Sequence, residues 1–281
     1  MPSTPTASSA LSPPERALSR DARAAQNLDA RSPAAFAFFA YWFERSLRAS
    51  FHAARMKGPP PAELNERKLV VYANHPSWWD GVAYVVIARR LMAGRPVYAP
   101  VDADMLKRYG FMRRMGGFGV DQTSARGAAD FLSLGRAALA RDAPLMIAAQ
   151  GRFADVRERP LRLRPGLAHL ADGEPELCFL PLALDYAFWN EKRPEMLFGF
   201  GPAIYARQLT ALGPRERVAA LEDRLTATLD DLTAAALSRD PGRFTTFVAG
   251  AGGIDPVYDA WRRLKAAARG KAFSPEHGAR K

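Results

Sequence analysis

The chain has 281 residues, 48% of them hydrophobic, which is enough to bury one large core. Its formal net charge of +11 favours partners that carry negative charge, such as anionic lipid, an acidic carrier protein or nucleic acid. The single cysteine, Cys178, excludes an internal disulfide, and its position in an apolar run predicts a buried side chain.

The apolar runs are too short for a membrane-spanning helix, which needs roughly 20 predominantly apolar residues. The first residues lack the apolar region of a secretory signal, and residues 1–33, rich in proline and small polar side chains, are expected to form a flexible tail. We therefore expect a cytoplasmic protein with no transmembrane helix, bound peripherally to the inner face of the membrane.

An amphipathic helix is predicted from Ala34 to His52, because apolar residues recur there at helical spacing. Phe38, Tyr41 and Trp42 widen its apolar sector beyond what a single core contact needs. Aromatic residues with basic neighbours suit a bilayer interface, so segment 34–58 is expected to associate with the membrane. The alternative is a helix buried by the rest of the fold.

Short apolar runs then alternate with helical patterns, which favours an α/β fold with a mostly parallel central sheet flanked by helices. This domain is expected to span 59–269, followed by a basic flexible tail at 270–281. The expected strands are Leu69–Ala73, Pro96–Pro100, Gly117–Val120, Leu145–Ala149, Leu177–Leu184 and Met196–Phe200, and the expected helices are Trp79–Met92, Ala125–Ala140, Arg215–Leu237 and Pro256–Ala268.

A histidine and a carboxylate lie close together where the strand at Leu69–Ala73 gives way to a helix. His75 follows the strand and Asp80 begins the helix. This spacing allows Asp80 to accept a hydrogen bond from one ring nitrogen, which leaves the other nitrogen free to act as a base. The alternative is structural, since Ser77 and Asp80 also match a helix capping box.

The string from Asn74 to Gly81 resembles the H-x4-D motif of the glycerolipid acyltransferases, which include the lysophosphatidic acid and glycerol-3-phosphate acyltransferases. The resemblance extends in order over residues 35 to about 205. It implies that His75 is the base and Asp80 its orienting partner, with Asn74 and Ser77 at the substrate. It also implies acyl-CoA or acyl carrier protein as donor, a lysophospholipid or related lipid alcohol as acceptor, and no metal or other cofactor.

The later motifs of the family depart from its pattern. Gln122 stands where the second motif usually has a phosphate-binding arginine, which Arg126 is near enough to replace. The third motif, usually Pro-Glu-Gly-Thr-Arg, is represented by Gln150, Gly151 and Arg152. All five are expected to bind substrate, and their altered charge suggests an acceptor other than ordinary lysophosphatidate.

The fourth motif, an apolar strand with proline, matches Phe179–Leu184. Tyr186 and Phe188, which follow it, are expected to pack in the core.

Two other functions remain open. The same His75 and Asp80 pair suits an ester or thioester hydrolase, although the chain lacks the G-x-S-x-G elbow of serine lipases. A non-catalytic basic protein bound to the membrane surface is the third possibility. The chain carries no recognisable nucleic-acid-binding motif and its histidines are scattered, so neither a nucleic-acid partner nor a metal site is expected.

Overall fold

The computed structural model describes residues 27–250 and residue 265. Most of the tail expected at 1–33, the helix expected at Pro256–Ala268 and the basic tail expected at 270–281 lie outside these residues. Of the expected N-terminal tail, residues 27–33 are described, and Leu28 among them is buried in the core.

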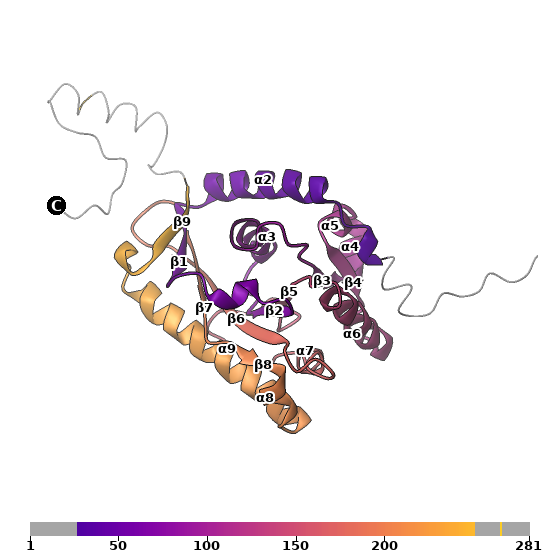
Figure 1. Cartoon of the computed structure of the whole chain (residues 1–281). Helices are drawn as coiled ribbons and strands as arrows, with labels where there is room; N and C mark the ends of the chain where they lie inside the picture. Colours follow the sequence, from indigo (N-terminus) through magenta and orange to yellow (C-terminus); the bar gives the residue numbers. More distant parts are fainter. Residues whose placement is uncertain (1–26, 251–264, 266–281) are drawn as a thin grey trace, which may run out of the picture.

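Figure 1 shows a central sheet with helices on both faces. The sheet has seven strands in the order β5-β2-β6-β7-β1-β9, with β8 paired to β6, and β3 and β4 form a separate pair. In chain order the strands are β1 (Ala53–Lys57), β2 (Leu69–Ala73), β3 (Ala99–Asp102), β4 (Gly117–Val120), β5 (Leu145–Ala148), β6 (Cys178–Ala187), β7 (Glu195–Phe200), β8 (Ile204–Tyr205) and β9 (Thr245–Ala249).

The α/β class with a mostly parallel, mixed sheet flanked by helices is confirmed. The pairs β2–β5, β2–β6, β1–β7 and β3–β4 are parallel. The pairs β6–β7, β6–β8 and β1–β9 are antiparallel. The strands β2, β5 and β6 run in the same direction. The residues that follow Ala73 and Ala148 therefore lie at the same end of the strands as the last part of β6.

The helices cover the two faces unequally. Helices α2 and α3 lie over one face, and the long helix α9 lies over the other (Figure 1). Among the described residues, no helix is both long and apolar enough to cross a bilayer. The helices are α2 (Pro33–Ser50), α3 (Asp80–Leu91), α4 (Ala103–Arg108), α5 (Phe111–Arg114), α6 (Ala125–Leu139), α7 (Gly166–His169), α8 (Ala206–Thr210) and α9 (Pro214–Leu237), with short 3-10 turns at Ala62–Asn65 and Pro241–Arg243.

Helix α2 begins where its sequence favours a start and ends earlier than expected. The Ser32 hydroxyl accepts a hydrogen bond from the N–H of Ala35 at 3.3 Å, and Pro33 occupies the first helical position. The helix ends at Ser50, so the helical segment expected to reach residue 58 is wrong over its last part. Ala53–Lys57 instead forms β1, between β7 and β9.

Arg55 interrupts the apolar pattern of β1, so the sequence did not predict this strand. Arg55 is buried in the middle of β1 because its Nε donates to Glu195 on β7 at 2.9 Å. Strand β9 was also missed, and β3 begins at Ala99 and not at Pro96.

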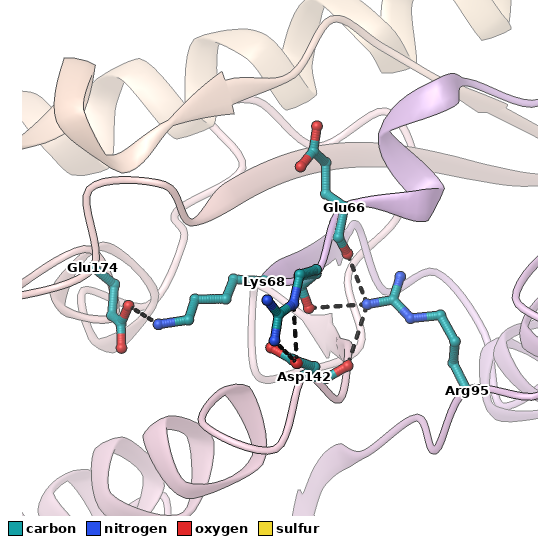
Figure 2. A network of polar contacts seen from close by, with 6 residues as sticks. Glu66, Lys68, Arg95, Asp142 and Glu174 are labelled. Carbon is teal, nitrogen blue, oxygen red and sulfur yellow. Dashed lines mark hydrogen bonds and ion pairs between the residues drawn. The ribbon is translucent and has the colours of Figure 1, made fainter.

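A polar network holds the opposite end of the sheet from the residues that follow β2. Figure 2 shows the Arg95 guanidinium against the backbone carbonyls of Glu66 and Asp142, at 2.7 Å and 3.3 Å. Lys68, just before β2, forms an ion pair with Glu174 in the same view. The contacts of Arg95 fasten the segment before β2 to the turn that leads into β5, and the ion pair of Lys68 fastens it to the segment before β6.

Candidate active site

The structure brings His75 and Asp80 together at the C-terminal end of β2. His75 follows β2, Asp80 is the first residue of α3, and Nδ1 of His75 lies 2.6 Å from Oδ2 of Asp80. Asp80 is fully buried, whereas the side chain of His75 remains 23% exposed. Because a carboxylate only accepts hydrogen bonds, the proton between the two groups belongs to Nδ1, and in the neutral ring Nε2 is then an acceptor.

Asp80 takes part in the start of α3 as well as in the contact with His75. Its Oδ2 accepts a hydrogen bond from the backbone N–H of Ser77 at 3.1 Å, which is one half of the expected capping box. The other half is absent, because the N–H of Asp80 donates to the backbone carbonyl of Ser77 and the Ser77 hydroxyl accepts from Trp79. Capping and contact with the imidazole are therefore compatible roles of the same carboxylate.

Tyr186 is a member of this site that sequence reasoning missed. Its hydroxyl donates to Oδ1 of Asp80 at 2.6 Å. The sequence predicted only core packing for Tyr186, and the pairing of β6 with β2 brings it to Asp80. Phe188, also expected in the core, is exposed, because it lies beyond the end of β6.

Two amide side chains hold the loops around His75. Asn74 donates to the carbonyl of Leu184 and accepts from its N–H, both at 2.8 Å. The oxygen of Gln150 accepts from the N–H of His75 at 2.9 Å, while its nitrogen donates to the carbonyl of Leu161 at 3.0 Å. We infer that these buried amides position the backbone, which differs from the substrate contact expected for them.

Of the remaining residues of the second and third motifs, the fold brings Gln122 and Gly151 together. Gly151 has a positive φ of 64°, and an added Cβ would lie 3.1 Å from Oε1 of Gln122 and 3.0 Å from Nε of Arg164. Gln122 and Gly151 therefore lie together, with Arg164 as the guanidinium beside them.

Arg126, near enough in sequence to replace the arginine missing from the second motif, and Arg152 of the third motif are placed differently. Arg152 forms an ion pair with Glu158. Arg126 is exposed in the first turn of α6, and its side chain forms no hydrogen bond or ion pair with another described residue. Neither is held beside Gln122 in the way that Arg164 is.

An aromatic ring lies beside the imidazole of His75. The ring of Phe153 lies 4.4 Å from that of His75, centroid to centroid, and the Phe153 side chain is 58% exposed. Trp78, in the loop between β2 and α3, is also largely exposed. Sequence reasoning did not single out either residue, because an isolated aromatic residue in a loop has no periodic pattern.

The described residues contain no group of three or more histidine, cysteine or acidic side chains arranged to hold a metal ion. No family model matches the chain, and no curated protein matches it significantly. The family resemblance of the motif at His75 therefore stays a prediction.

The structure predicts that Gln150→Glu destabilises the protein, although glutamate is the usual residue in the third motif of the family. An ionised carboxylate cannot donate to the carbonyl of Leu161, so we expect the free energy of unfolding to fall by about 1–3 kcal/mol at neutral pH. A protonated glutamic acid can donate, so the loss should shrink as the pH is lowered. Urea denaturation at several pH values measures both effects.

Gln208→Glu is the matched control. Gln208 is exposed, and its oxygen accepts from the N–H of Tyr205 at 2.9 Å, a bond that a carboxylate retains. Equal stability of the wild type and Gln208→Glu is expected. A Gln150→Glu variant as stable as the wild type at neutral pH would show that the amide of Gln150 does not hold this loop.

Proposed function

We propose that the protein is an acyltransferase that moves a fatty acyl group from a thioester to the hydroxyl of a lipid alcohol. The observation that carries this proposal is the hydrogen bond between Nδ1 of His75 and the buried carboxylate of Asp80, which leaves Nε2 of a partly exposed ring as a base. A thioester is already an activated acyl donor, so the reaction needs no protein nucleophile.

In the proposed reaction, Nε2 of His75 removes the proton of the alcohol while its oxygen attacks the thioester carbonyl carbon. The tetrahedral intermediate then collapses, the carbon–sulfur bond breaks, and the imidazolium returns the proton to the leaving thiolate. The products are an ester and a free thiol. Asp80 keeps the ring in the required tautomer and stabilises the imidazolium by its charge.

The carbonyl oxygen gains negative charge in this intermediate and needs hydrogen-bond donors. The backbone N–H groups in the first turn of α3, where Gly81 is exposed next to Asp80, are candidates for this role. Acyl-CoA and acyl carrier protein are both acidic donors that suit the net charge of +11.

The substitutions in the second and third motifs, together with partial charge neutralisation in the loop after β5, favour an acceptor other than ordinary lysophosphatidate. Three arginines of this loop pair with acidic side chains, Arg152 with Glu158, Arg157 with Asp155 and Arg159 with Asp230. Arg162 and Arg164 form no ion pair with another described residue, and Arg164 is the cation that lies beside Gln122 and Gly151. The exposed ring of Phe153 adds apolar surface beside His75, and Trp78 on the loop between β2 and α3 is also exposed. A lysolipid, sugar or terpenoid alcohol without a phosphate monoester fits these features better.

Helix α2 supports a site at a membrane surface. Its buried residues, Ala40 and Leu47, face the rest of the fold, whereas Phe38, Tyr41 and Trp42 are about half exposed. Phe51, which follows the helix, contacts the rings of Trp79 and Tyr186. We propose that the outer aromatic side of α2 binds the lipid interface and brings the site to its acceptor, on the cytoplasmic side of the membrane.

Replacing His75 by alanine is predicted to lower the rate of thiol release from an acyl thioester in the presence of alcohol by roughly 10²–10⁴-fold, since the base is lost. His169→Ala is the matched control, because His169 forms a comparable but exposed pair with Asp172, at 3.4 Å. Circular dichroism checks that both variants fold. Turnover by His75→Ala equal to that of the wild type would exclude this mechanism.

An acceptor panel tests the proposed substrate class. At equal concentrations of a thioester donor, we expect lysophosphatidate to be acylated more slowly than at least one neutral lysolipid, sugar or terpenoid alcohol. Mass spectrometry of the ester products gives the order of rates. Acylation of lysophosphatidate ahead of every other alcohol would contradict the proposal.

The membrane role of α2 predicts that a triple replacement of Phe38, Tyr41 and Trp42 by serine weakens binding to anionic vesicles about ten-fold or more. The reason is that each large apolar side chain contributes roughly 1.5–3 kcal/mol when it is buried. Vesicle co-sedimentation measures the partition. Leu237→Ser, which alters an exposed apolar residue at the end of α9, serves as the control and should bind as the wild type does. Undiminished binding by the triple variant would rule out α2 as the membrane contact.

A further inference from the structure

The carboxylate of Asp80 has no exposure to solvent, so the protein must supply the hydrogen bonds that stabilise its charge. Among the described residues, three donors reach it: Nδ1 of His75 at 2.6 Å, the N–H of Ser77 at 3.1 Å and the hydroxyl of Tyr186 at 2.6 Å. The bonds from His75 and Ser77 share Oδ2, whereas Tyr186 is the one of these three donors that is bonded to Oδ1. Removing the Tyr186 hydroxyl would therefore leave Oδ1 without its side-chain donor.

Tyr186 is held firmly in position to make this bond. It lies near the end of β6, directly opposite Met196 on β7, and its ring packs against Phe51 at 5.8 Å between centroids. Strand β6 is also paired with β2, which carries His75 on the loop at its end. The position of the hydroxyl is thus fixed by the same sheet that positions the imidazole.

The hydroxyl of Tyr186 acts as a donor over the whole range in which a histidine base works. Burial raises the pKa of Tyr186 well above its ordinary value, and the nearby charge of Asp80 raises it further. Two other titratable groups lie close by, Tyr84 on α3 and Asp185 on β6. Burial also raises the pKa of each. The higher pKa keeps Tyr84 uncharged near neutral pH, whereas it moves the titration of Asp185 toward neutral pH, so the pH profiles are compared between variants that all retain Asp185.

We propose that Tyr186 is a positioning residue, which through its hydrogen bond to Oδ1 fixes the orientation of the Asp80 carboxylate and limits how strongly Asp80 holds the proton of His75. This inference rests on the proposed acyl transfer, because it assigns Tyr186 a role in tuning the base of that reaction. Tyr186 contacts Asp80 and not the ring of His75, so it acts on the base only through the carboxylate.

The chain contains a matched control for this hydroxyl. Tyr84 lies one turn after Asp80 on α3, and the charge of Asp80 acts on it as well. Its hydroxyl is buried and has no hydrogen-bond partner among the described residues. Tyr84→Phe therefore removes a buried phenolic oxygen near the same carboxylate without breaking a hydrogen bond to it.

The experiment compares Tyr186→Phe, Tyr84→Phe and the wild type in kcat, KM and pH dependence. Loss of a hydrogen bond to a charged group should lower kcat of Tyr186→Phe about ten-fold, with KM unchanged, because the residue holds Asp80 and not the substrate. Without the Tyr186 hydroxyl, the charge of the Asp80 carboxylate is stabilised by one hydrogen bond fewer. The carboxylate then stabilises the protonated ring of His75 more strongly. The acid limb of the rate profile should then move to higher pH, while Tyr84→Phe behaves as the wild type.

A readout independent of turnover separates this inference from the proposed function. The proton between Nδ1 of His75 and Asp80 should give a far-downfield proton NMR signal, assigned by its disappearance in His75→Ala. This signal should shift in Tyr186→Phe and stay in place in Tyr84→Phe. An unchanged signal and an unchanged pH profile in Tyr186→Phe would overturn the positioning role.

The NMR signal tests the inference even if the wild type transfers no acyl group. In that case the proposed acyl transfer is refuted, and the role of Tyr186 is still tested. A shifted signal would still support the coupling of Tyr186 to the pair, and an unshifted one would refute it.

Discussion

A carboxylate without solvent exposure is the constraint around which this edge of the sheet is organised. Asp80 is fully buried at the start of α3, and an isolated charge in that position would be strongly destabilising. Its bonds to His75, Ser77 and Tyr186 come from a loop and from a neighbouring strand, so the charge is satisfied only when β2, α3 and β6 are assembled. The geometry of the proposed base is therefore a consequence of folding and needs no substrate to form it.

The loops around this carboxylate are fixed by neutral groups. The amides of Asn74 and Gln150 tie the residues after β2 to β6 and to the loop after β5. A glutamate at position 150 would add a second negative charge close to Asp80, whereas the amide provides a donor and an acceptor at once. The site thus keeps one buried charge beside the imidazole, with Phe153 packed on the ring and neutralised arginines farther along the loop.

Local patterns in the sequence were sufficient for the parts of the fold that local chemistry determines. The strand at β2, the helix at α9 and the facing of His75 and Asp80 follow from apolar periodicity and from a five-residue spacing. Strands β1 and β9 could not be predicted in this way. Arg55 breaks the apolar run of β1 and is buried only because Glu195, 140 positions later, pairs with it. Tyr186 was missed for a related reason, since its contact with Asp80 depends on the register of β6 against β2.

The most direct test of the central claim is the fate of a labelled acyl chain. The purified protein would receive one acyl-CoA carrying a radiolabel in its acyl group, with and without a lipid alcohol, and the labelled products would be separated. The proposed mechanism predicts that the label appears in an ester when the alcohol is present and that little free fatty acid forms without it. Equal release of labelled fatty acid in both conditions, with no labelled ester, would contradict acyl transfer and indicate hydrolysis by the same pair.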